Sequence, residues 1–196
     1  MLLNNMASTL KQVPAIVKIA KEAKLRPLDT RDCIARRVEA NAERFGQRNA
    51  VVFEDQSLSW EELNAAGNRY AATLSGLGLV RGDVVSVIME NRIEFLSTLI
   101  GLNKLGVTAS LVNTNLTGRP LVHCISITES KMCLFGEERM DAIADALPDL
   151  PLEQGKNYLS VSDSGATGCP EWAIDLGAAA AGADPANRPE TDQVEL

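Results

Sequence analysis

The chain has 196 residues, of which 45% are hydrophobic, 23% are charged and only 4% are aromatic. This composition excludes a disordered polymer and predicts a globular fold whose core is built from Leu, Val, Ile and Ala. The 26 acidic residues outnumber the 19 basic ones, which gives a formal charge of −7. Because a polyanion is attracted to a basic face, this balance disfavours general nucleic-acid binding, and we expect no nucleic-acid partner.

Cysteine and histidine give no sign of a metal site. Cys33, Cys124, Cys133 and Cys169 form no CxxC pair and match no zinc spacing, and His123 is the only histidine. We expect reduced thiols in a cytoplasmic protein, with membrane association as an open alternative. No apolar run reaches the roughly 18 residues that a membrane span needs. No secretory signal peptide is evident at the start of the chain.

Residues 1–30 are predicted to form an N-terminal extension that carries a short basic amphipathic helix. Between residues 14 and 24, Ile16 and Val17 share one helical face, whereas the lysines lie on another. Such a helix can lie on an anionic membrane surface, or its apolar face can dock on the rest of the protein. Its shortness favours docking, and peripheral membrane contact through residues 14–24 stays the alternative.

The next segment predicts a helix, a hairpin and another helix. Residues 31–48 have helical spacing, and the run VVFED at 51–55 is typical of a short strand that turns into a returning strand. Ser59 and Glu62 have the spacing of a capping box, in which each side chain bonds the other residue's backbone N–H. We therefore expect a helix to start directly after Ser59 and to run to about residue 75.

Strands and helices then alternate up to residue 147. Apolar runs predict strands at 84–89, 107–112 and 131–135, and helical spacing follows each of them at 92–105, 120–128 and 137–147. This order predicts right-handed crossovers and a mainly parallel sheet that carries helices on its faces. Residues 31–147 are therefore predicted to be an α/β unit, with the strand at 107–112 buried like its neighbours.

From residue 148 onward the pattern changes. Five prolines and five glycines interrupt the chain, and AAAAGAD at 178–184 carries little information. We expect an irregular, loop-rich tail over residues 148–196.

Four polar residues are candidates for shaping a ligand pocket. Asn91 and Arg92 follow the strand at 84–89, and Asn113 and Asn115 follow the strand at 107–112. Ligands of open α/β sheets bind near the carboxyl ends of the strands. Asparagine is also favoured in caps and turns, and Asn91 can cap the following helix. Capping and turn formation are the simpler interpretation of these residues.

Other motifs give weaker signals. The glycines of GLGLVRG at 76–82 lie between a helix and a strand, which is the wrong order for a dinucleotide-binding fingerprint. The acidic run GEERMDAIAD at 136–145 is most simply the solvated face of a helix. We therefore expect neither motif to carry chemistry.

The run RGDVVSVIMENRIEFLSTLIGLNKLGVTASLVNTNL at 81–116, together with LSWEEL at 58–63, resembles the start of the superfamily of adenylating enzymes that includes acyl-CoA synthetases, luciferases and peptide-synthetase adenylation domains. NTNL at 113–116, and the pairing of FEDQSLSW with MENRIEF, are similar to the branch of fatty-acid-transport proteins and very-long-chain acyl-CoA synthetases. The resemblance covers residues 31–147 well and the tail loosely.

This resemblance implies activation of a fatty acid with ATP, Mg²⁺ and coenzyme A. The family's ATP-binding loop, rich in Gly, Ser and Thr with a lysine, is expected beyond Leu196, so we assign no catalytic, cofactor-binding or metal residue here. SGATGCPE at 164–171 imitates that loop's rhythm. We reject it as a phosphate site because Glu171 stands at the lysine position, Asp163 and Asp175 add negative charge, and no buried strand is predicted before it.

Three hypotheses stay open at this point. The chain is part of a long-chain or very-long-chain fatty-acid–CoA ligase, or a non-catalytic truncated paralogue that acts as a scaffold or binds acyl chains or a partner, or part of an adenylating enzyme for another carboxylate. In each case the isolated chain is expected to be inactive and marginally stable, because a parallel sheet usually needs neighbours on both sides.

Overall fold

The fold is built around one parallel sheet, whose strands point successive side chains to opposite faces. The computed structural model describes residues 14, 17, 33–162 and 168–187, and the fold is that of the unit formed by residues 31–195. The sheet has five strands in the order β4-β3-β5-β6-β7, and every neighbouring pair is parallel. The strands are β3 (Val84–Ile88), β4 (Thr108–Leu111), β5 (Met132–Gly136), β6 (Tyr158–Val161) and β7 (Ile174–Asp175). The predicted mainly parallel α/β fold is confirmed.

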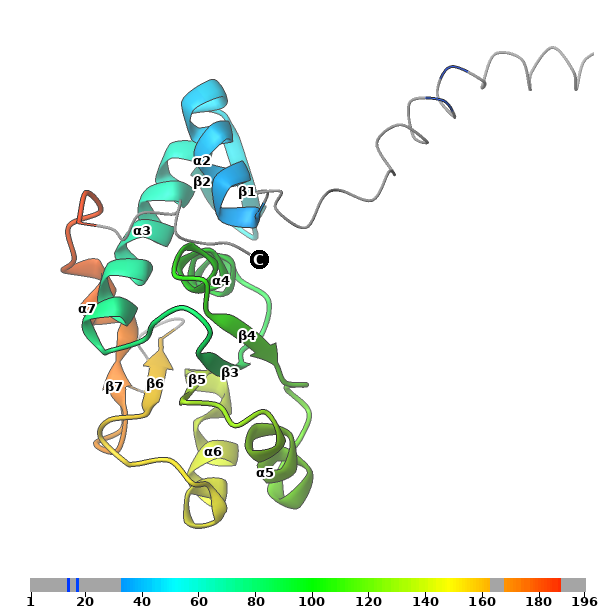
Figure 1. Ribbon diagram of the computed structural model, residues 1–196, viewed down its shortest axis with the longest axis vertical. Coiled ribbons are helices and arrows are strands. Elements are labelled where there is room, and N and C mark those ends of the chain that lie inside the picture. Colours follow the sequence, from blue (N-terminus) through cyan, green and yellow to red (C-terminus); the bar gives the residue numbers. More distant parts are fainter. Residues whose placement is uncertain (1–13, 15–16, 18–32, 163–167, 188–196) are drawn as a thin grey trace, which may run out of the picture. The chain divides into compact units, whose positions relative to one another are not determined.

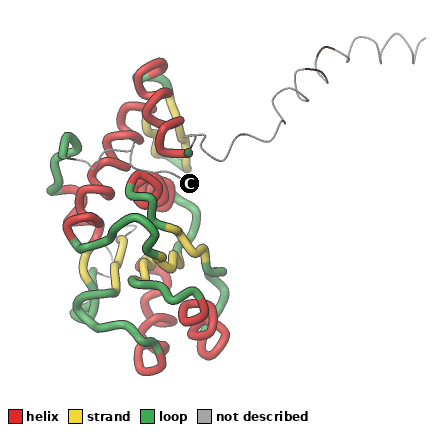
Figure 2. Tube along the Cα trace, in the orientation of Figure 1, coloured by secondary structure: helices red, strands yellow, loops and turns green. Residues whose placement is uncertain are grey.

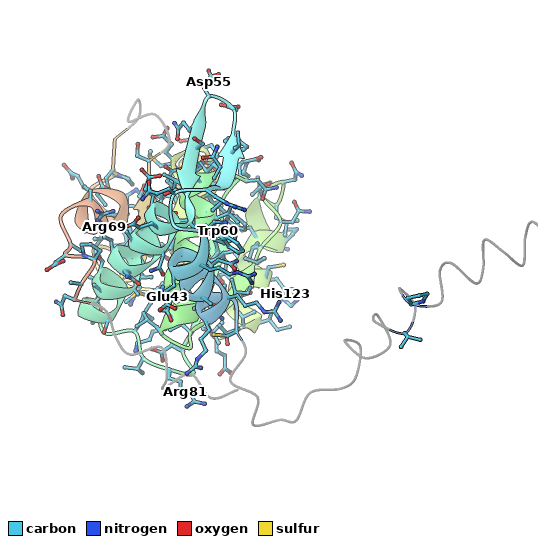
Figure 3. All side chains as sticks on the ribbon, turned by 90° about the horizontal axis from the view of Figure 1, so that it is seen from above. Glu43, Asp55, Trp60, Arg69, Arg81 and His123 are labelled. Atoms are coloured by element: carbon cyan, nitrogen blue, oxygen red, sulfur yellow. The ribbon has the colours of Figure 1, made fainter. Side chains whose placement is uncertain are left out.

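A helix and a small hairpin precede the sheet. Helix α2 covers Ile34–Phe45, and the antiparallel strands β1 (Asn49–Phe53) and β2 (Gln56–Ser59) form the predicted hairpin, with Asp55 at its tip (Figure 3). Helix α3 (Trp60–Gly76) starts with the predicted capping box. The Ser59 Oγ accepts the Glu62 N–H at 3.2 Å, and the Glu62 Oε2 accepts the Ser59 N–H at 2.8 Å.

Helices cover both faces of the sheet. Helices α3, α4 and α7 lie on one side, and α5 and α6 lie on the other (Figures 1 and 2). The additional helices are α4 (Ile93–Lys104), α5 (Gly118–Ile127), α6 (Met140–Ala146) and α7 (Leu176–Ala181), with 3₁₀ turns at Glu137–Arg139 and Leu147–Asp149. Both faces are buried, as the continuous apolar runs of the strands require.

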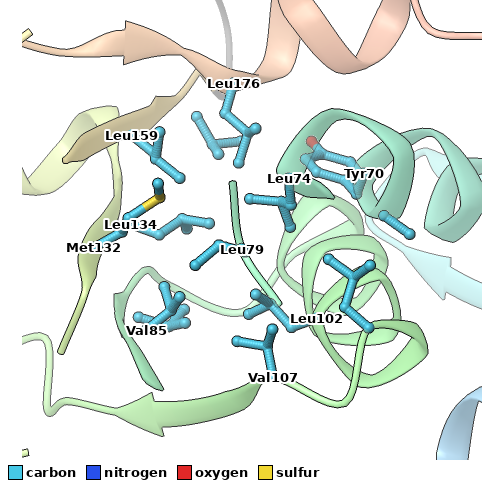
Figure 4. Packing of buried hydrophobic residues seen from close by; sticks show 14 of the residues in the cluster. Tyr70, Leu74, Leu79, Val85, Leu102, Val107, Met132, Leu134, Leu159 and Leu176 are labelled. Carbon is cyan, nitrogen blue, oxygen red and sulfur yellow. The ribbon is translucent and has the colours of Figure 1, made fainter. Parts of the chain in front are cut away.

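Each face has its own apolar core. On the α3/α4/α7 side, Val85 of β3 lies in one core with Leu74 and Leu102 from the helices (Figure 4), and Val87 belongs to the same core. On the α5/α6 side, Ile88 and its neighbours from β5 and β6 meet the apolar faces of those helices. The period of two residues along each strand therefore sends successive side chains into different cores.

Helices α3 and α4 touch through two glycines. A Cβ atom added to Gly101 would lie 2.7 Å from the Tyr70 Cβ and 3.0 Å from the Ala71 backbone nitrogen. A Cβ atom on Gly67 would lie 2.5 Å from the Cγ2 of Ile100. Real Cβ atoms do not approach other atoms so closely, so any larger residue here must separate the two helices.

A buried lysine joins α4 to the two preceding helices. The Lys104 side chain has 0% exposure, and its ammonium lies 2.6 Å from the Glu39 Oε1 of α2 and 3.0 Å from the Asn64 Oδ1 of α3. The neighbouring Asn103 Oδ1 accepts the Ala35 N–H at 2.9 Å, in the first turn of α2. This bond satisfies a backbone N–H in the first turn of α2, where the N-cap residue Cys33 forms no side-chain capping bond.

The strand at 107–112 differs from the prediction in its position. It forms β4 at the edge of the described sheet, where Leu111 is 61% exposed and Thr108 is also exposed. The expectation that it is buried like its neighbours is therefore wrong. The apolar run could not show this, because strand order is set by the crossovers and not by the strand's own sequence.

The predicted loop-rich tail also contributes regular structure. Residues 158–161 form β6, which is buried throughout, and residues 174–181 form β7 and α7. Part of the segment predicted to be irregular is therefore regular, and the prolines and glycines around β6 and β7 concealed these two short strands. Residues 163–167 and 188–196 lie outside the described part of the chain.

Little of the N-terminal extension can be compared with its prediction. Within residues 1–30, only Pro14 and Val17 are described, both are helical, and both are exposed. The rest of the basic helix over residues 14–24 lies outside the described residues, so membrane contact and docking both stay predictions. Among the helices that the structure does describe, none has the length and apolar character needed to cross a bilayer.

The α3–α4 contact predicts the effect of a small substitution. Gly101→Ala should lower the free energy of unfolding by about 1–3 kcal/mol, because the new methyl group meets backbone atoms that cannot move aside. Urea titration followed by circular dichroism measures the change. Gly76→Ala is the matched control, since a Cβ there meets nothing within 4 Å. Equal midpoints for the two variants would contradict this account of the helix contact.

Replacing either partner of the Lys104–Glu39 ion pair should lower the free energy of unfolding, but by unequal amounts. Glu39→Met leaves a fully buried ammonium without its carboxylate and should cost about 3 kcal/mol or more. Lys104→Met should cost less, because the Glu39 side chain is 20% exposed and can turn toward water. The double variant should be more stable than Glu39→Met alone. Chemical denaturation tests this order, and a Lys104→Met variant that is the least stable of the three would refute it.

Candidate functional site

The carboxyl end of the sheet gathers polar residues from several strands. Because the strands are parallel, β3, β4, β5 and β6 all end on the same side of the molecule. The residues that follow them include the segments 90–92, 113–116 and 137–139, and Ser162. Open α/β sheets bind their ligands at this end. It is therefore the candidate functional site.

Arg92 is the buried centre of this end of the sheet. Its residue exposure is 6%, although it comes directly before α4. The Nη1 atom donates to the Glu138 Oε2 at 2.8 Å, and the Nη2 atom donates to the Val161 carbonyl at 3.0 Å. The Glu94 Oε2 lies 3.8 Å from the Arg92 Nε. One guanidinium therefore connects the exits of β3, β5 and β6.

The three candidate asparagines do not share this arrangement. Asn91 is exposed, and the N-cap of α4 is Arg92, which forms no side-chain capping bond, so the expected capping role of Asn91 is wrong. Asn113 and Asn115 are also exposed. The Asn113 Oδ1 accepts the Asn115 N–H at 2.9 Å, which is the local turn that the simpler interpretation favoured.

The four candidates therefore do not converge on one pocket. Arg92 reaches from β3 toward β5 and β6, whereas Asn113 and Asn115 follow β4 on the opposite side of β3. Sequence placed all of them at strand ends, but it held no information on the order of the strands. A role for the four in shaping a pocket stays a prediction.

Two residues of this end were missed by sequence reasoning. Glu137 and Glu138 belong to the acidic run that was expected to be a solvated helix face. Glu138 is exposed, as expected, but it also binds Arg92, and the Glu137 Oε2 accepts a hydrogen bond from the Ser162 Oγ at 3.0 Å. Their position directly after a predicted buried strand is the sequence feature that places them at this end of the sheet.

The motif at 164–171 also has a different setting from the expected one. Strand β6 is fully buried and ends two residues before Asp163, so the statement that no buried strand leads into this segment is wrong. Residues 163–167 lie outside the described part of the chain. Of the described remainder, Glu171 is exposed, and the neighbouring Trp172 stacks on Phe135 with ring centroids 5.2 Å apart.

An open pocket lies beside the start of α4. It has a volume of about 440 Å³ and is lined by residues of the hairpin, α3 and α4, including Leu58, Tyr70, Glu94 and Ser97. Burial raises the pKa of Tyr70 to about 12, and the Glu94 carboxylate adds to the shift. None of the four candidate site residues lines this pocket.

The described residues include no group of three or more His, Cys, Asp or Glu side chains arranged to hold a metal ion. His123 is exposed on α5, well away from the labelled hairpin tip (Figure 3). A metal role for the described part of the chain therefore has no geometric support.

Comparison with known proteins identifies the family. Residues 38–193 match the family described as AMP-binding enzyme, which is most of the chain. The chain belongs to this AMP-binding enzyme family. The resemblance to adenylating enzymes is thereby confirmed on a segment that contains the whole described sheet and both of its helix layers.

Relatives of this chain include proteins named for fatty acids. It is 36% identical over 130 residues to long-chain fatty acid transport protein 1 of Rattus norvegicus, which covers 65% of this chain and 20% of that protein. It is 28% identical over 144 residues to the medium/long-chain-fatty-acid–CoA ligase FadD6 of Mycobacterium tuberculosis, which covers 74% of this chain and 24% of the ligase. The chain thus spans about a fifth to a quarter of these relatives.

Solved structures share the fold of this chain. The anthranilate CoA ligase AuaEII superposes with a TM-score of 0.72 at 19% identity, over 82% of this chain and 29% of that enzyme. The N-terminal domain of FACL13 from Mycobacterium tuberculosis superposes with a TM-score of 0.64 at 22% identity, over 78% of this chain and 36% of that domain. At these identities the likeness supports the fold alone.

The two tyrosines of the chain predict a measurable alkaline transition. Burial raises the pKa of Tyr70 and that of Tyr158 to about 12, with smaller contributions from Glu94 and Cys133 respectively. In the unfolded chain both should ionise near pH 10. Because the folded pKa values are the higher ones, stability should be intact below pH 10 and fall between pH 10 and 12.

Absorbance at 295 nm during pH titration tests this expectation. The folded chain should show no tyrosinate step below about pH 11, whereas the chain in guanidinium should show both near pH 10. Tyr70→Phe assigns the remaining step to Tyr158. A tyrosine that titrates near pH 10 in the folded chain would show that its ring is not buried as described.

Proposed function

We propose that this polypeptide is the amino-terminal part of a long-chain or very-long-chain fatty-acid–CoA ligase. The reaction is fatty acid + ATP + CoA to acyl-CoA + AMP + pyrophosphate. In its first step, a carboxylate oxygen attacks the α-phosphorus of ATP and pyrophosphate leaves. In its second step, the CoA thiol attacks the acyl carbon and AMP leaves.

The observation that carries this proposal is the sequence match to two fatty-acid proteins. A transport protein and a CoA ligase from distant organisms match 65% and 74% of the chain, and the family is that of AMP-binding enzymes. The whole-protein activity is part of the proposal, because the matched region is at most 24% of either protein.

The described residues do not by themselves fit a triphosphate and its Mg²⁺. Arg92 directs its donors at Glu138 and at the Val161 carbonyl, and Glu94 stands beside it. A triphosphate needs converging N–H donors and uncommitted positive charge, and here the cation is already neutralised. We therefore derive no phosphate-binding step from the described part of the sheet. What it offers is a rigid support for the ends of the strands.

The proposal is tested on the polypeptide encoded by the complete reading frame that contains these residues. With ATP, Mg²⁺ and a C16 or C24 fatty acid it should catalyse exchange of labelled pyrophosphate into ATP, and with CoA it should form acyl-CoA. The 196-residue chain alone should give exchange no faster than a blank. Activity with anthranilate or benzoate but not with fatty acids would favour an adenylating enzyme for another carboxylate.

Two further results would overturn parts of this picture. A complete reading frame that ends at Leu196, together with no ATP turnover, would favour a non-catalytic scaffold or acyl-binding protein. Tight Mg²⁺-dependent binding of ATP to the 196-residue chain, measured by calorimetry, would show that a nucleotide site is already present in it.

A further inference from the structure

The buried position of Arg92 calls for an explanation beyond helix capping. Its side chain is 5% exposed, and a buried guanidinium is costly unless it is paired and hydrogen-bonded. The partners of Arg92 come from two other strand exits. Its Nη1 atom binds Glu138, which lies two residues after β5, and its Nη2 atom binds Val161, the last residue of β6.

Glu138 is held in place from two directions. Its Oε2 accepts from Arg92 at 2.8 Å, and its Oε1 accepts the Glu90 backbone N–H at 2.8 Å. The carboxylate thus binds both the backbone and the side chain of the segment that leaves β3. This arrangement fixes the exits of β3 and β5 to each other.

Gly136 makes room for this carboxylate. A Cβ atom at Gly136, the last residue of β5, would lie 2.2 and 2.3 Å from the two Glu138 oxygens. The φ angle of Gly136 is −76°, so the backbone itself does not require glycine. The atoms that a Cβ would meet are those at the end of the Glu138 side chain, which would have to move. Any side chain at residue 136 would push the carboxylate away from Arg92.

The exit of β6 is fixed by the same group of residues. Arg92 binds the Val161 carbonyl at 3.0 Å, and the next residue, Ser162, donates from its Oγ to the Glu137 Oε2 at 3.0 Å. Two successive residues of β6's exit are therefore bonded to residues from β3 and β5. Val161 is also paired with Gly136 in the sheet register.

A direct role for Arg92 in binding an anion fits these contacts poorly. Glu138 lies at 2.8 Å and Glu94 at 3.8 Å, so two carboxylates face one guanidinium. An incoming phosphate or carboxylate would have to displace one of them and would be repelled by the other. The geometry favours a residue that holds protein groups in position.

We propose that Arg92, Glu138 and Gly136 form a positioning clamp, which fixes the exit of β6 against the exits of β3 and β5. We call these three residues the β6 clamp. The clamp determines where the chain leaves the sheet after Val161, at the end where sheets of this kind bind ligands. Its relevance to catalysis rests on the proposed function, but its geometry does not.

Hydrogen exchange on the 196-residue chain, read by mass spectrometry, tests the β6 clamp. In Gly136→Ala and in Arg92→Lys, peptides that cover residues 132–138 and 158–162 should exchange about tenfold faster, as expected when a hydrogen bond to a charged group is lost. Lysine keeps the charge but cannot present two donors in the fixed fork of a guanidinium. Peptides from α5 should change less than about twofold.

Non-additivity distinguishes a clamp from ordinary packing. Gly136→Ala and Arg92→Lys break the same unit, so the double variant should exchange no faster at residues 158–162 than either single variant. Gly76→Ala, where a Cβ meets nothing within 4 Å, is the matched control and should exchange like the parent chain. Additive effects, or equal acceleration in every peptide, would overturn the proposal.

Glu138→Gln provides a second test in case Gly136→Ala or Arg92→Lys does not fold. It keeps the shape of the side chain and removes its charge, and its effect should again be confined to residues 132–138 and 158–162. A spectroscopic readout is independent of exchange: the Arg92 Nη protons should give separate ¹⁵N-edited signals at low temperature that merge in Glu138→Gln. Unchanged signals would refute the pairing.

Failure of this proposal and failure of the proposed function are distinguishable. The exchange and NMR measurements need no substrate, so they report on the clamp even if the complete protein has no ligase activity. Conversely, ligase activity together with additive exchange effects would support the proposed function and refute the proposed clamp.

Discussion

Helix α4 touches α3 at two glycines, and the position of α4 depends on this close contact. The contacts at Gly67 and Gly101 let the two helices approach until backbone meets backbone, and this fixes α4 over β3 and β4. Both ends of α4 then carry buried cations. At its C-terminal end, Lys104 fastens α2 and α3, and directly before its first residue Arg92 reaches the exits of β5 and β6. A wider α3–α4 spacing would move both cations away from their partners.

Much of this fold could be predicted from local pattern. The capping box of Ser59 and Glu62, the hairpin before it, and the alternation of strands and helices up to residue 147 all depend on residues close together in sequence. Strand order does not, so β4 was expected to be buried although it lies at the edge of the described sheet. Strands β6 and β7 were missed because they lie in the segment after residue 148 that prolines and glycines interrupt, and β7 has only two residues.

The candidate site could also be predicted only in part, because its contacts depend on the order of the strands. The sequence showed that Asn91, Arg92, Asn113 and Asn115 follow strands, and local hydrogen bonding explains the turn at Asn113. The partners of Arg92 lie 46 and 69 residues further along the chain. Glu138 is exposed, and the acidic run around it gives no sign that it binds a buried cation. Only the order β3-β5-β6 makes it a partner for Arg92.

The charges at the carboxyl end of the sheet indicate which task this segment would have in an adenylating enzyme and which task other segments would have. Glu94 and Glu138 lie beside the buried Arg92, and Glu90 and Glu137 belong to the adjoining segments, so that acidic residues outnumber this one arginine. Such a surface repels a triphosphate but can hold strand exits rigidly, because the Glu137 and Glu138 carboxylates both accept hydrogen bonds from neighbouring strand exits. In the proposed ligase, this part of the sheet therefore supplies position, and positive charge for ATP must come from residues outside the described clamp.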